Sequence, residues 1–397
     1  MCLGPFFGYL VGCCETLEFI AYVISAVIPF GEMLTPLFNA PVKYEPIYWT
    51  FFFVTAVGIN VIGGKVFWTF NRIIGTVSLL LILIYIASTI QYCDFSKHAE
   101  APTTFDGGNF LTFLPLATWW YIGVEALPLA CVDCEKPQIQ IPIGMTLCIV
   151  TLICTAFAVF FTTTSQPPGT AALAEALLPL NFGYQRVFGM SDTLVGWFAI
   201  PATYATGFGF MWVYGRQMCS MARSGLFPSI FKLRTGTAQT PYTALLFGSL
   251  IAVAGVVSIY YTELTLLTNI FNICVISSYT IYISVFISYI VFKYRYSGVQ
   301  RKFNNPFGIP SAIIGICVFA MGLVSVIGYQ GPNQASLIVF VCYVFLITLY
   351  YYFYGYKTQK LSEEEHKVLF KAYVINGTFD SVIDFELYLF LFSFQQI

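Results

Sequence analysis

The chain has 397 residues, of which 58% are apolar and 9% are Asp, Glu, Lys or Arg, and its formal net charge is -1. A soluble domain carries roughly 25% charged residues, so this composition excludes a water-soluble globule. The near-neutral charge gives no basic face for nucleic acid, and we expect no nucleic-acid partner. A mean hydropathy of +0.77 predicts instead an all-α polytopic membrane protein embedded in a lipid bilayer.

A helix that crosses a bilayer needs about 20 mainly apolar residues. Apolar and polar residues do not alternate along the apolar runs of this chain, which disfavours a β-barrel. The sequence therefore predicts about ten transmembrane helices, each bounded by charge, proline or polar clusters. The runs cover residues 5–30, 47–62, 73–90, 110–131, 141–163, 193–213, 243–261, 264–292, 310–329 and 335–354.

The distribution of Lys and Arg predicts the orientation of these helices, because cytoplasmic loops carry an excess of basic residues. With a cytoplasmic N-terminus, eleven basic residues fall in cytoplasmic loops and four in the C-terminal tail. Only Lys43, Lys97 and Arg186 then lie on the other side. We therefore expect an integral multi-pass protein of the plasma membrane with both termini in the cytoplasm.

The chain divides into a transmembrane domain at residues 1–354 and a cytoplasmic tail at residues 355–397. The end of the tail, residues 381–397, is apolar again but too short to cross a bilayer. Two interpretations stay open for it: an interfacial helix, or an incorrect reading frame at the end of the gene model.

The fourth run holds two prolines, Pro115 and Pro128, with Gly123 and Glu125 between them. Proline removes an intrahelical hydrogen bond, and glycine leaves helical geometry at low cost. In a bilayer an unwound stretch persists only where it is buried in protein or lines a cavity. We therefore expect the run to unwind near Gly123 and Glu125 to take part in function. The alternative is a simple proline kink in which Glu125 is bonded to a neighbouring helix.

Glu15, Glu18 and Tyr22 form a second candidate site in the first run. Their spacing of three and then four residues places them on one helical face. Carboxylates that face lipid are costly, so this face is expected to point inward. A purely structural hydrogen-bonded pair is the alternative. No Lys or Arg lies deep inside any predicted span, so the interior is net acidic and suits an amine or a proton better than a free anion.

Other features of the sequence exclude several kinds of chemistry. Cys131 and Cys134 form a C-x-x-C pair, but no second pair or nearby histidine completes a zinc site. The two histidines, His98 and His366, both lie outside the predicted spans. The sequence has no P-loop motif for ATP and no nucleophile–histidine set. We therefore expect no cofactor, no metal site and no enzyme activity.

Several motifs of the chain resemble the amino acid–polyamine–organocation permeases. The most specific is the fourth run and its exit, with Trp119, Gly123-x-Glu125, Pro128-Leu-Ala and Glu135-Lys136-Pro137. This pattern looks most like the ethanolamine-permease branch of that family. Residues 4–12 are similar to the opening of the family's third helix, and residues 216–228 to the loop after its eighth helix. The resemblance covers most of residues 4–354.

The resemblance implies a five-plus-five inverted repeat within twelve helices, with the substrate held between the broken first and sixth helices. In this alignment the chain starts at the family's third helix, and its ten runs correspond to helices three to twelve. The bundle is then partial, and the glycine-rich broken first helix is absent. We expect either a fragment from an incomplete gene model or a product that cannot transport as it stands.

These observations together predict that residues 1–354 form an amino acid permease-like domain. Its expected function is secondary active transport of amino acids or small organic amines across the membrane, coupled to an ion as in a symporter. A truncated, non-transporting paralogue or a membrane scaffold is the alternative. In the leading interpretation aromatic rings hold an ammonium group by cation–π attraction, and Glu125 supplies the counter-charge or carries the coupling proton. The candidate substrate-binding residues are Glu125, Gly123, Trp119, Trp120, Tyr121, Glu18, Glu15 and Tyr22.

Overall fold

The computed structural model describes residues 2–99, 106–174, 176–262, 265–295, 302–330 and 334–360. Within these ranges the chain is helical, and its extended pairing is limited to an isolated bridge between Thr235 and Thr240. Ten helical segments of the described chain are long and apolar enough to cross a membrane. The predicted all-α polytopic fold with about ten spans is thereby confirmed.

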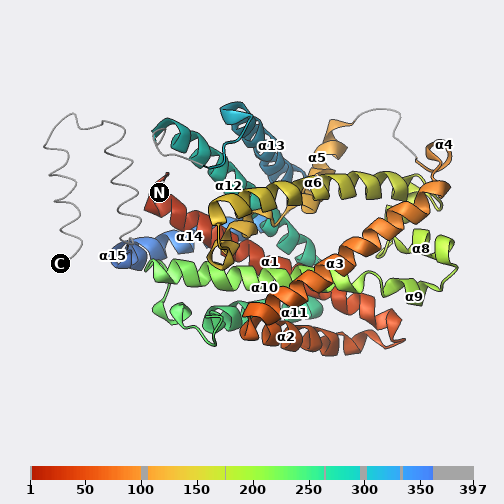
Figure 1. The fold of residues 1–397 in the computed structure, drawn as a ribbon, viewed down its shortest axis with the longest axis horizontal. Helices are drawn as coiled ribbons and strands as arrows, with labels where there is room; N and C mark the ends of the chain where they lie inside the picture. The colour runs from red at the N-terminus through yellow and green to blue at the C-terminus, as the bar shows by residue number, and fades with distance from the viewer. Residues whose placement is uncertain are drawn as a thin grey trace, which may run out of the picture.

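The spans are built on ten main helices (Figure 1). In chain order these are α1 (Pro5–Leu37), α2 (Glu45–Ile62), α3 (Gly64–Thr89), α5 (Gly107–Thr118), α6 (Pro137–Thr164), α10 (Ile200–Arg223), α11 (Tyr242–Thr262), α12 (Thr265–Arg295), α13 (Gly308–Tyr329) and α14 (Ala335–Tyr350). Several of them extend beyond the predicted runs. Lys65 and Arg72, for example, lie inside α3, because a charge marks the limit of an apolar run and not the end of a helix.

Shorter helices complete or connect the spans. The fourth span continues from α5 through η3 (Trp119–Tyr121) and η4 (Val124–Asp133). The last span continues from α14 through η6 (Tyr351–Gly355) into α15 (Tyr356–Thr358). The second span begins with η1 (Val42–Tyr44), the third ends with η2 (Ile90–Tyr92), and the sixth begins with α9 (Asp192–Gly196). The connecting segments are α4 (Phe95–His98), α7 (Thr170–Ala174), α8 (Asn181–Phe188) and η5 (Ser229–Lys232).

Helix α1 lies at the centre of the bundle and packs against α10, α12, α2 and α11 (Figure 1). In its most apolar stretch 78% of the residues are buried, against 11% for α3 and for α6. Phe19, Tyr22 and Phe30 are almost completely enclosed. Because α1 meets protein on nearly every side, each polar group on it must find its partners inside the bundle.

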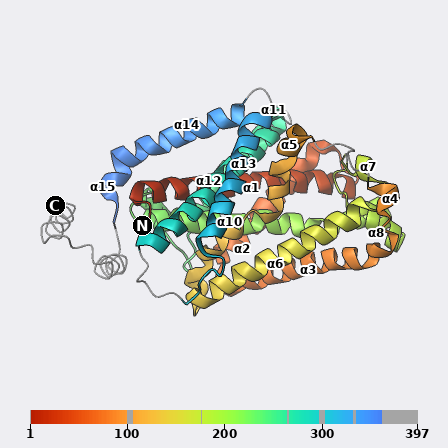
Figure 2. The same cartoon turned by 90° about the horizontal axis from the view of Figure 1, so that it is seen from above.

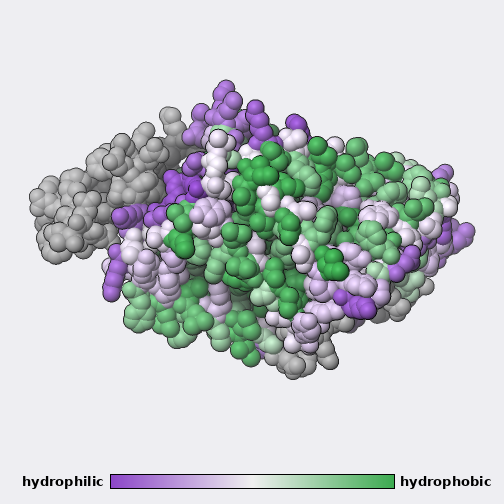
Figure 3. Space-filling view, turned by 90° about the horizontal axis from the view of Figure 1, so that it is seen from below, coloured by the Kyte–Doolittle hydropathy of each residue, from purple (hydrophilic) through white to green (hydrophobic). Residues whose placement is uncertain are grey.

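Helices α3 and α6 lie side by side along one edge of the bundle, with α14 along the opposite edge (Figure 2). Large apolar side chains such as Leu80 and Leu83 of α3 and Leu147 and Phe157 of α6 point away from the protein. Hydrophobic residues likewise cover much of the middle of the face shown in Figure 3. A surface of this kind is compatible with lipid and not with water.

The connecting helices α4, α8 and α9 gather at one end of the bundle, and the N-terminus and α15 lie at the other (Figure 1). The Asn181 and Gln185 side chains of α8 both donate to Asp192 at the start of α9, at 2.9 Å and 2.7 Å. The position of both described chain ends at one end of the bundle is what an even number of spans requires. Which end is cytoplasmic stays a prediction. The apolar stretch 381–397 and most of the predicted tail lie outside the described residues.

Candidate functional site

The fourth span is broken where the sequence predicts it to unwind. After η3, Ile122 is extended with φ -72° and ψ 145°, and Gly123 adopts a left-handed conformation with φ 95°. A side chain at position 123 would be strained by this φ, and its Cβ would lie 3.1 Å from Cζ of Phe210. Glycine therefore allows both the reversal of the backbone and the close approach of α10. At the break, backbone N–H and C=O groups inside the membrane-spanning region lack the hydrogen bonds that a regular helix would provide.

A cavity of about 620 Å³ adjoins this break. Seven of its twenty described lining residues are aromatic, among them Trp119 and Trp120 from η3, Tyr22 from α1 and Phe210 from α10. The rings of Trp119 and Tyr22 meet edge to face, with centroids 5.0 Å apart, and Trp119 also packs against Phe271 of α12 at 4.9 Å. The cavity is thus held by rings from four different segments. Its other lining residues are Phe67, Trp68, Asn71, Ile122, Gly123, Val124, Ala126, Leu127, Ala130, Cys148, Leu152, Ala205, Thr206, Gly209, Trp212 and Val213.

The carboxyl group of Glu125 lies behind the cavity wall and joins the broken span to α12. Its Oε2 accepts a hydrogen bond from the Tyr282 hydroxyl at 2.5 Å and another from the Gly123 N–H at 3.1 Å. The second bond fixes the backbone reversal, because it ties the left-handed residue to a side chain two positions later. Oε1 of Glu125 is buried and has no hydrogen-bond partner among the described residues.

Glu18 of α1 is completely buried. The Ser278 hydroxyl of α12 donates to its Oε1 at 2.5 Å and lies 2.9 Å from the Tyr22 hydroxyl. The other oxygen, Oε2, has no hydrogen-bond partner in the described part of the chain. The Glu18 and Glu125 carboxyl groups are close enough to influence one another electrostatically. Two buried carboxyl groups this close do not both hold a full negative charge without a proton or a cation to offset the repulsion.

Glu15 is the third member of this acidic cluster. It lies one helical turn before Glu18 and interacts electrostatically with both Glu18 and Glu125. Its Oε2 accepts a hydrogen bond from the side-chain amide of Gln217 on α10. The two ion pairs within the described residues lie elsewhere, between Lys97 and Asp94 and between Arg216 and Asp133. Glu15, Glu18 and Glu125 are therefore clustered without a basic side chain to neutralise them.

Seven of the eight predicted residues fall into two groups. Tyr22, Trp119, Trp120 and Gly123 line the cavity. The three carboxyl groups form the adjoining acidic cluster. The eighth residue, Tyr121, is half-buried on η3 and is not among the residues that line the cavity. The predicted direct contact of Glu125 with a ligand stays a prediction, because its carboxyl group is turned toward Tyr282 in this conformation.

Sequence reasoning missed the residues of α12 that hold the acidic cluster. Ser278 and Tyr282 lie four positions apart, on one face of a long apolar helix. The polar run Ser277-Ser278-Tyr279-Thr280 in the middle of the eighth predicted span was the available signal. Gln217 near the end of the sixth span is a comparable signal. No group of three or more His, Cys, Asp or Glu side chains in the described chain is arranged to hold a metal ion.

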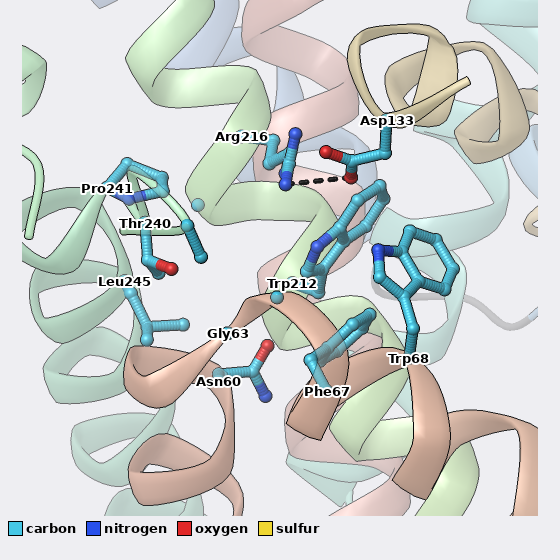
Figure 4. A pocket seen from close by; sticks show the side chains of 13 residues that line it. Asn60, Gly63, Phe67, Trp68, Asp133, Trp212, Arg216, Thr240, Pro241 and Leu245 are labelled. Carbon is cyan, nitrogen blue, oxygen red and sulfur yellow. Dashed lines mark ion pairs between the residues drawn. The ribbon is translucent and has the colours of Figure 1, made fainter. Parts of the chain in front are cut away.

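A smaller pocket of about 250 Å³ lies on the other side of an aromatic partition (Figure 4). Phe67, Trp68 and Trp212 line both this pocket and the larger cavity. Above it the Arg216 guanidinium is paired with the Asp133 carboxylate at 2.9 Å and lies 4.6 Å from the centroid of the Trp212 ring. The ion pair joins the end of η4 to α10, so it connects the broken span to the centre of the bundle.

Comparison with known proteins identifies the family. Residues 2–351 match the family model described as amino acid permease. The chain is 24% identical over 300 residues to an uncharacterized transporter of Rhizobium meliloti, an alignment that covers 73% of this chain and 62% of the relative. It is 23% identical over 340 residues to the methylthioribose transporter of Bacillus subtilis, covering 84% of this chain and 68% of the relative. The chain thus spans about two thirds of the length of these relatives.

The match extends over nearly the whole transmembrane region, as the resemblance to amino acid–polyamine–organocation permeases implies. The assignment to the ethanolamine branch and the start at the third helix stay predictions. Together with the ten membrane-spanning helices and the broken fourth span, the match shows that this chain belongs to the amino acid permease family.

Proposed function

We propose that this protein is a secondary active transporter. It moves small organic amines or amino acids across the plasma membrane, and an ion gradient drives this transport. The observation that carries the proposal is the break at Gly123 beside an aromatic cavity of about 620 Å³. Broken helices at such cavities are the usual binding elements of secondary transporters. The names of the two relatives support transport as the activity.

The chemistry around the cavity favours a substrate with an ammonium group. Trp119, Trp120 and Tyr22 present aromatic rings, which attract cations through their negative faces. The acidic cluster lies directly behind this wall, so ionisation of one of its carboxyl groups would make the electrostatic potential in the cavity negative. Among the described residues, no Lys, Arg or His lines the cavity. A free carboxylate would therefore find no basic partner there, whereas an ammonium group finds both rings and negative charge.

A binding measurement on the full chain in lipid nanodiscs tests this assignment. Titration calorimetry compares ethanolamine with ethylene glycol, which replaces the ammonium group by a hydroxyl, and with methylthioribose, an uncharged ligand. We expect saturable binding of ethanolamine and none of the two uncharged compounds. Equal binding of ethylene glycol, or binding of methylthioribose alone, would contradict an ammonium site.

A matched pair of variants tests the location. Trp119→Leu removes a ring from the cavity wall, whereas Trp197→Leu removes a similarly exposed ring that packs on Phe38. The first change should weaken ethanolamine binding by roughly three- to thirtyfold, the range expected of one cation–π contact. The second should leave binding unchanged. Uptake of radiolabelled ethanolamine into proteoliposomes under an imposed ion gradient then tests transport itself.

A further inference from the structure

A pocket of about 280 Å³ lies beside the N-terminal turns of α1, and Glu15 forms part of its wall. Gly4, Gly8 and Gly12 line it from α1, and Ser284 and Ser288 line it from α12. Water that enters this pocket from the N-terminal end of α1 therefore reaches a carboxyl group at its inner limit. Glu15 interacts electrostatically with Glu18, which lies farther along α1, and Glu18 interacts in the same way with Glu125.

At its inner end the same cluster reaches the large cavity by two connections. Glu125 accepts from the N–H of Gly123, which lines the cavity. Glu18 accepts from Ser278, which is bonded to the hydroxyl of Tyr22, a second lining residue. The acidic cluster thus lies between two separate cavities. Glu18, which is fully buried with one oxygen lacking a donor, lies between them.

The geometry points to a proton relay in which Glu15 and Glu18 carry protons from the pocket beside Gly8 to Glu125, behind the wall of the cavity beside Gly123. Each step moves one proton and no electrons. A hydronium ion in the pocket gives a proton to Glu15 and becomes water. The new O–H bond on Glu15 breaks as one forms on Glu18, and that bond breaks in turn as one forms on Glu125, where the proton stays. Each donor regains its negative charge as it releases the proton, and one proton shared by Glu18 and Glu125 bonds the two oxygens that otherwise lack a donor.

The groups that face Glu18 are compatible with this role. Cys14 and Tyr22 face it from α1, Cys274 and Tyr282 from α12, and Glu125 from η4. Thiols and phenols are neutral near neutral pH, and the contact from α10 to the cluster is the neutral amide of Gln217. No fixed positive charge therefore holds these carboxyl groups permanently ionised, and a proton can reside on them. The role of the relay in coupling rests on the proposed transport function.

Protonation also has a structural consequence at the break. Charged Glu125 is a stronger acceptor for the Gly123 N–H and the Tyr282 hydroxyl than the neutral acid. Arrival of a proton therefore weakens the bonds that hold the reversed backbone at Gly123. A change in proton concentration on one side of the membrane would in this way change the conformation of the cavity wall at Gly123.

Infrared spectroscopy of the full chain in nanodiscs tests the relay without any ligand. Protonated carboxyl groups give a C=O band that shifts when the proton exchanges for deuterium, so the rate of the shift after transfer to D₂O measures proton access. Glu18→Gln and Glu125→Gln assign the band. We expect Glu15→Gln to slow its exchange by at least about tenfold and Glu15→Asp to restore it. Exchange at the parent rate in Glu15→Gln overturns the relay. The relay is also overturned if neither Glu18→Gln nor Glu125→Gln removes a band of a protonated carboxyl group.

Variants at glycine positions test the pocket as the entrance independently of Glu15. Gly8 lines the pocket and a Cβ there meets no atom within 4 Å, so the side chain of Gly8→Leu begins in open space beside the entrance. It should slow exchange as Glu15→Gln does. Gly58→Leu on α2, also at a position with open space, and Glu32→Gln, farther along α1, are the controls and should exchange at the parent rate. Parent-rate exchange in Gly8→Leu overturns the pocket as the entrance.

The outcome is separable from that of the transport proposal. If the protein does not bind or take up ethanolamine but its proton–deuterium exchange still depends on Glu15, the amine assignment is refuted and the relay stands. If the protein binds ethanolamine but the exchange does not depend on Glu15, the relay is refuted and the amine site stands.

Discussion

The hydroxyl of Tyr282 on α12 donates a hydrogen bond of 2.5 Å to the carboxyl group of Glu125, across 157 positions of the sequence. The same oxygen of Glu125 accepts from the N–H of Gly123, the residue with left-handed backbone. A side chain of α12 therefore holds the group that in turn holds the break in the fourth span. Movement of α12 relative to the fourth span would therefore change the wall of the cavity directly.

The first prediction concerns this hydrogen bond. Tyr282→Phe removes the hydroxyl and leaves a buried carboxyl oxygen with one donor fewer. We expect the free energy of unfolding to fall by about 1–3 kcal/mol, the cost of a buried group that loses its partner. The midpoint of thermal unfolding in detergent measures the change.

Tyr289→Phe is the matched control, because the Tyr289 hydroxyl lies on the same helix and has no hydrogen-bond partner among the described residues. Its removal should not lower the midpoint, because a buried hydroxyl without a partner contributes no hydrogen bond to stability. Equal midpoints for the two variants would show that the Tyr282–Glu125 bond contributes nothing to stability.

The spans were predictable from the sequence for a simple physical reason. A bilayer requires about 20 apolar residues per crossing, so each span is visible locally. The break was predictable as well, because Pro115, Gly123 and Pro128 are concentrated in one run. The helix ends were less predictable: α1 continues to Leu37 through Pro29 and Pro36, since neighbouring helices support a kinked helix in a membrane protein.

The direction of the Glu125 side chain was not predictable. Its carboxyl group is adjacent in sequence to residues that line the cavity, yet it bonds to Tyr282 of a distant helix. The direction of the side chain depends on how α12 packs in the bundle, and no local sequence pattern predicts this packing. The spacing of Glu15 and Glu18 correctly indicated an inward face, whereas their contact with Glu125 needed the tertiary fold.

The second prediction compares the two ion pairs of the described chain. Arg216 and Asp133 are 20% and 28% exposed, whereas Lys97 and Asp94 are 74% and 36% exposed. A double-mutant cycle with Arg216→Gln and Asp133→Asn should give a coupling energy of at least about 1 kcal/mol, because partial burial reduces screening. The same cycle on Lys97 and Asp94 should give about 0.2–1 kcal/mol or less.

Arg216→Lys refines the interpretation. It retains the positive charge but loses the flat group that lies over Trp212. An intermediate loss of stability is expected from unfolding midpoints. Full retention of stability in this variant would mean that the ring contact has no energetic role.

The third prediction concerns the orientation of the chain. Single cysteines introduced at exposed Arg186 on α8 and at exposed Lys232 on η5 lie on opposite sides of the expected membrane. A membrane-impermeant maleimide added to intact cells should label Arg186→Cys and spare Lys232→Cys, with the parent chain as the background for its native thiols. The reverse pattern would place the N-terminus outside and refute the prediction from basic residues.

The fourth prediction concerns pH and the connecting helix α8. Burial raises the pKa of Tyr184 to about 12, and its hydroxyl donates to the carbonyl oxygen of Leu81 at 2.7 Å. An unfolded tyrosine has a pKa of about 10, so the folded state holds this proton more tightly. The contribution to stability is therefore complete below about pH 10 and is lost as the pH rises through the folded value.

Tyr184→Phe isolates this contribution. Near neutral pH it should lower the free energy of unfolding by about 0.5–1.5 kcal/mol, the value of one hydrogen bond. As the pH rises above about 10, the difference between parent and variant should shrink. A difference that is constant with pH would show that Tyr184 does not ionise in this range.

The fifth prediction concerns recognition of the amine. Glu125→Gln keeps the shape of the side chain and its ability to bond to Tyr282 but deletes the negative charge behind the cavity. If an ammonium group binds beside Trp119, loss of a charge at this distance should weaken ethanolamine binding by roughly ten- to a hundredfold. Glu32→Gln makes the same chemical change on α1 ten residues beyond the cavity-lining Tyr22. A rise of about 15 Å separates the two positions, which exceeds the screening length of about 8–10 Å, so binding should be unchanged.

The pH dependence of binding separates an electrostatic role of Glu125 from a structural one. In the parent chain acidification neutralises the acidic cluster and should weaken ethanolamine binding, because a neutral acid no longer attracts an ammonium group. In Glu125→Gln the weaker binding should vary less with pH, since one of the titrating groups is gone. Calorimetry across a pH series measures both. If Glu125→Gln binds ethanolamine like the parent at every pH, then Glu125 serves only to fix the break at Gly123 and the ammonium group is recognised elsewhere.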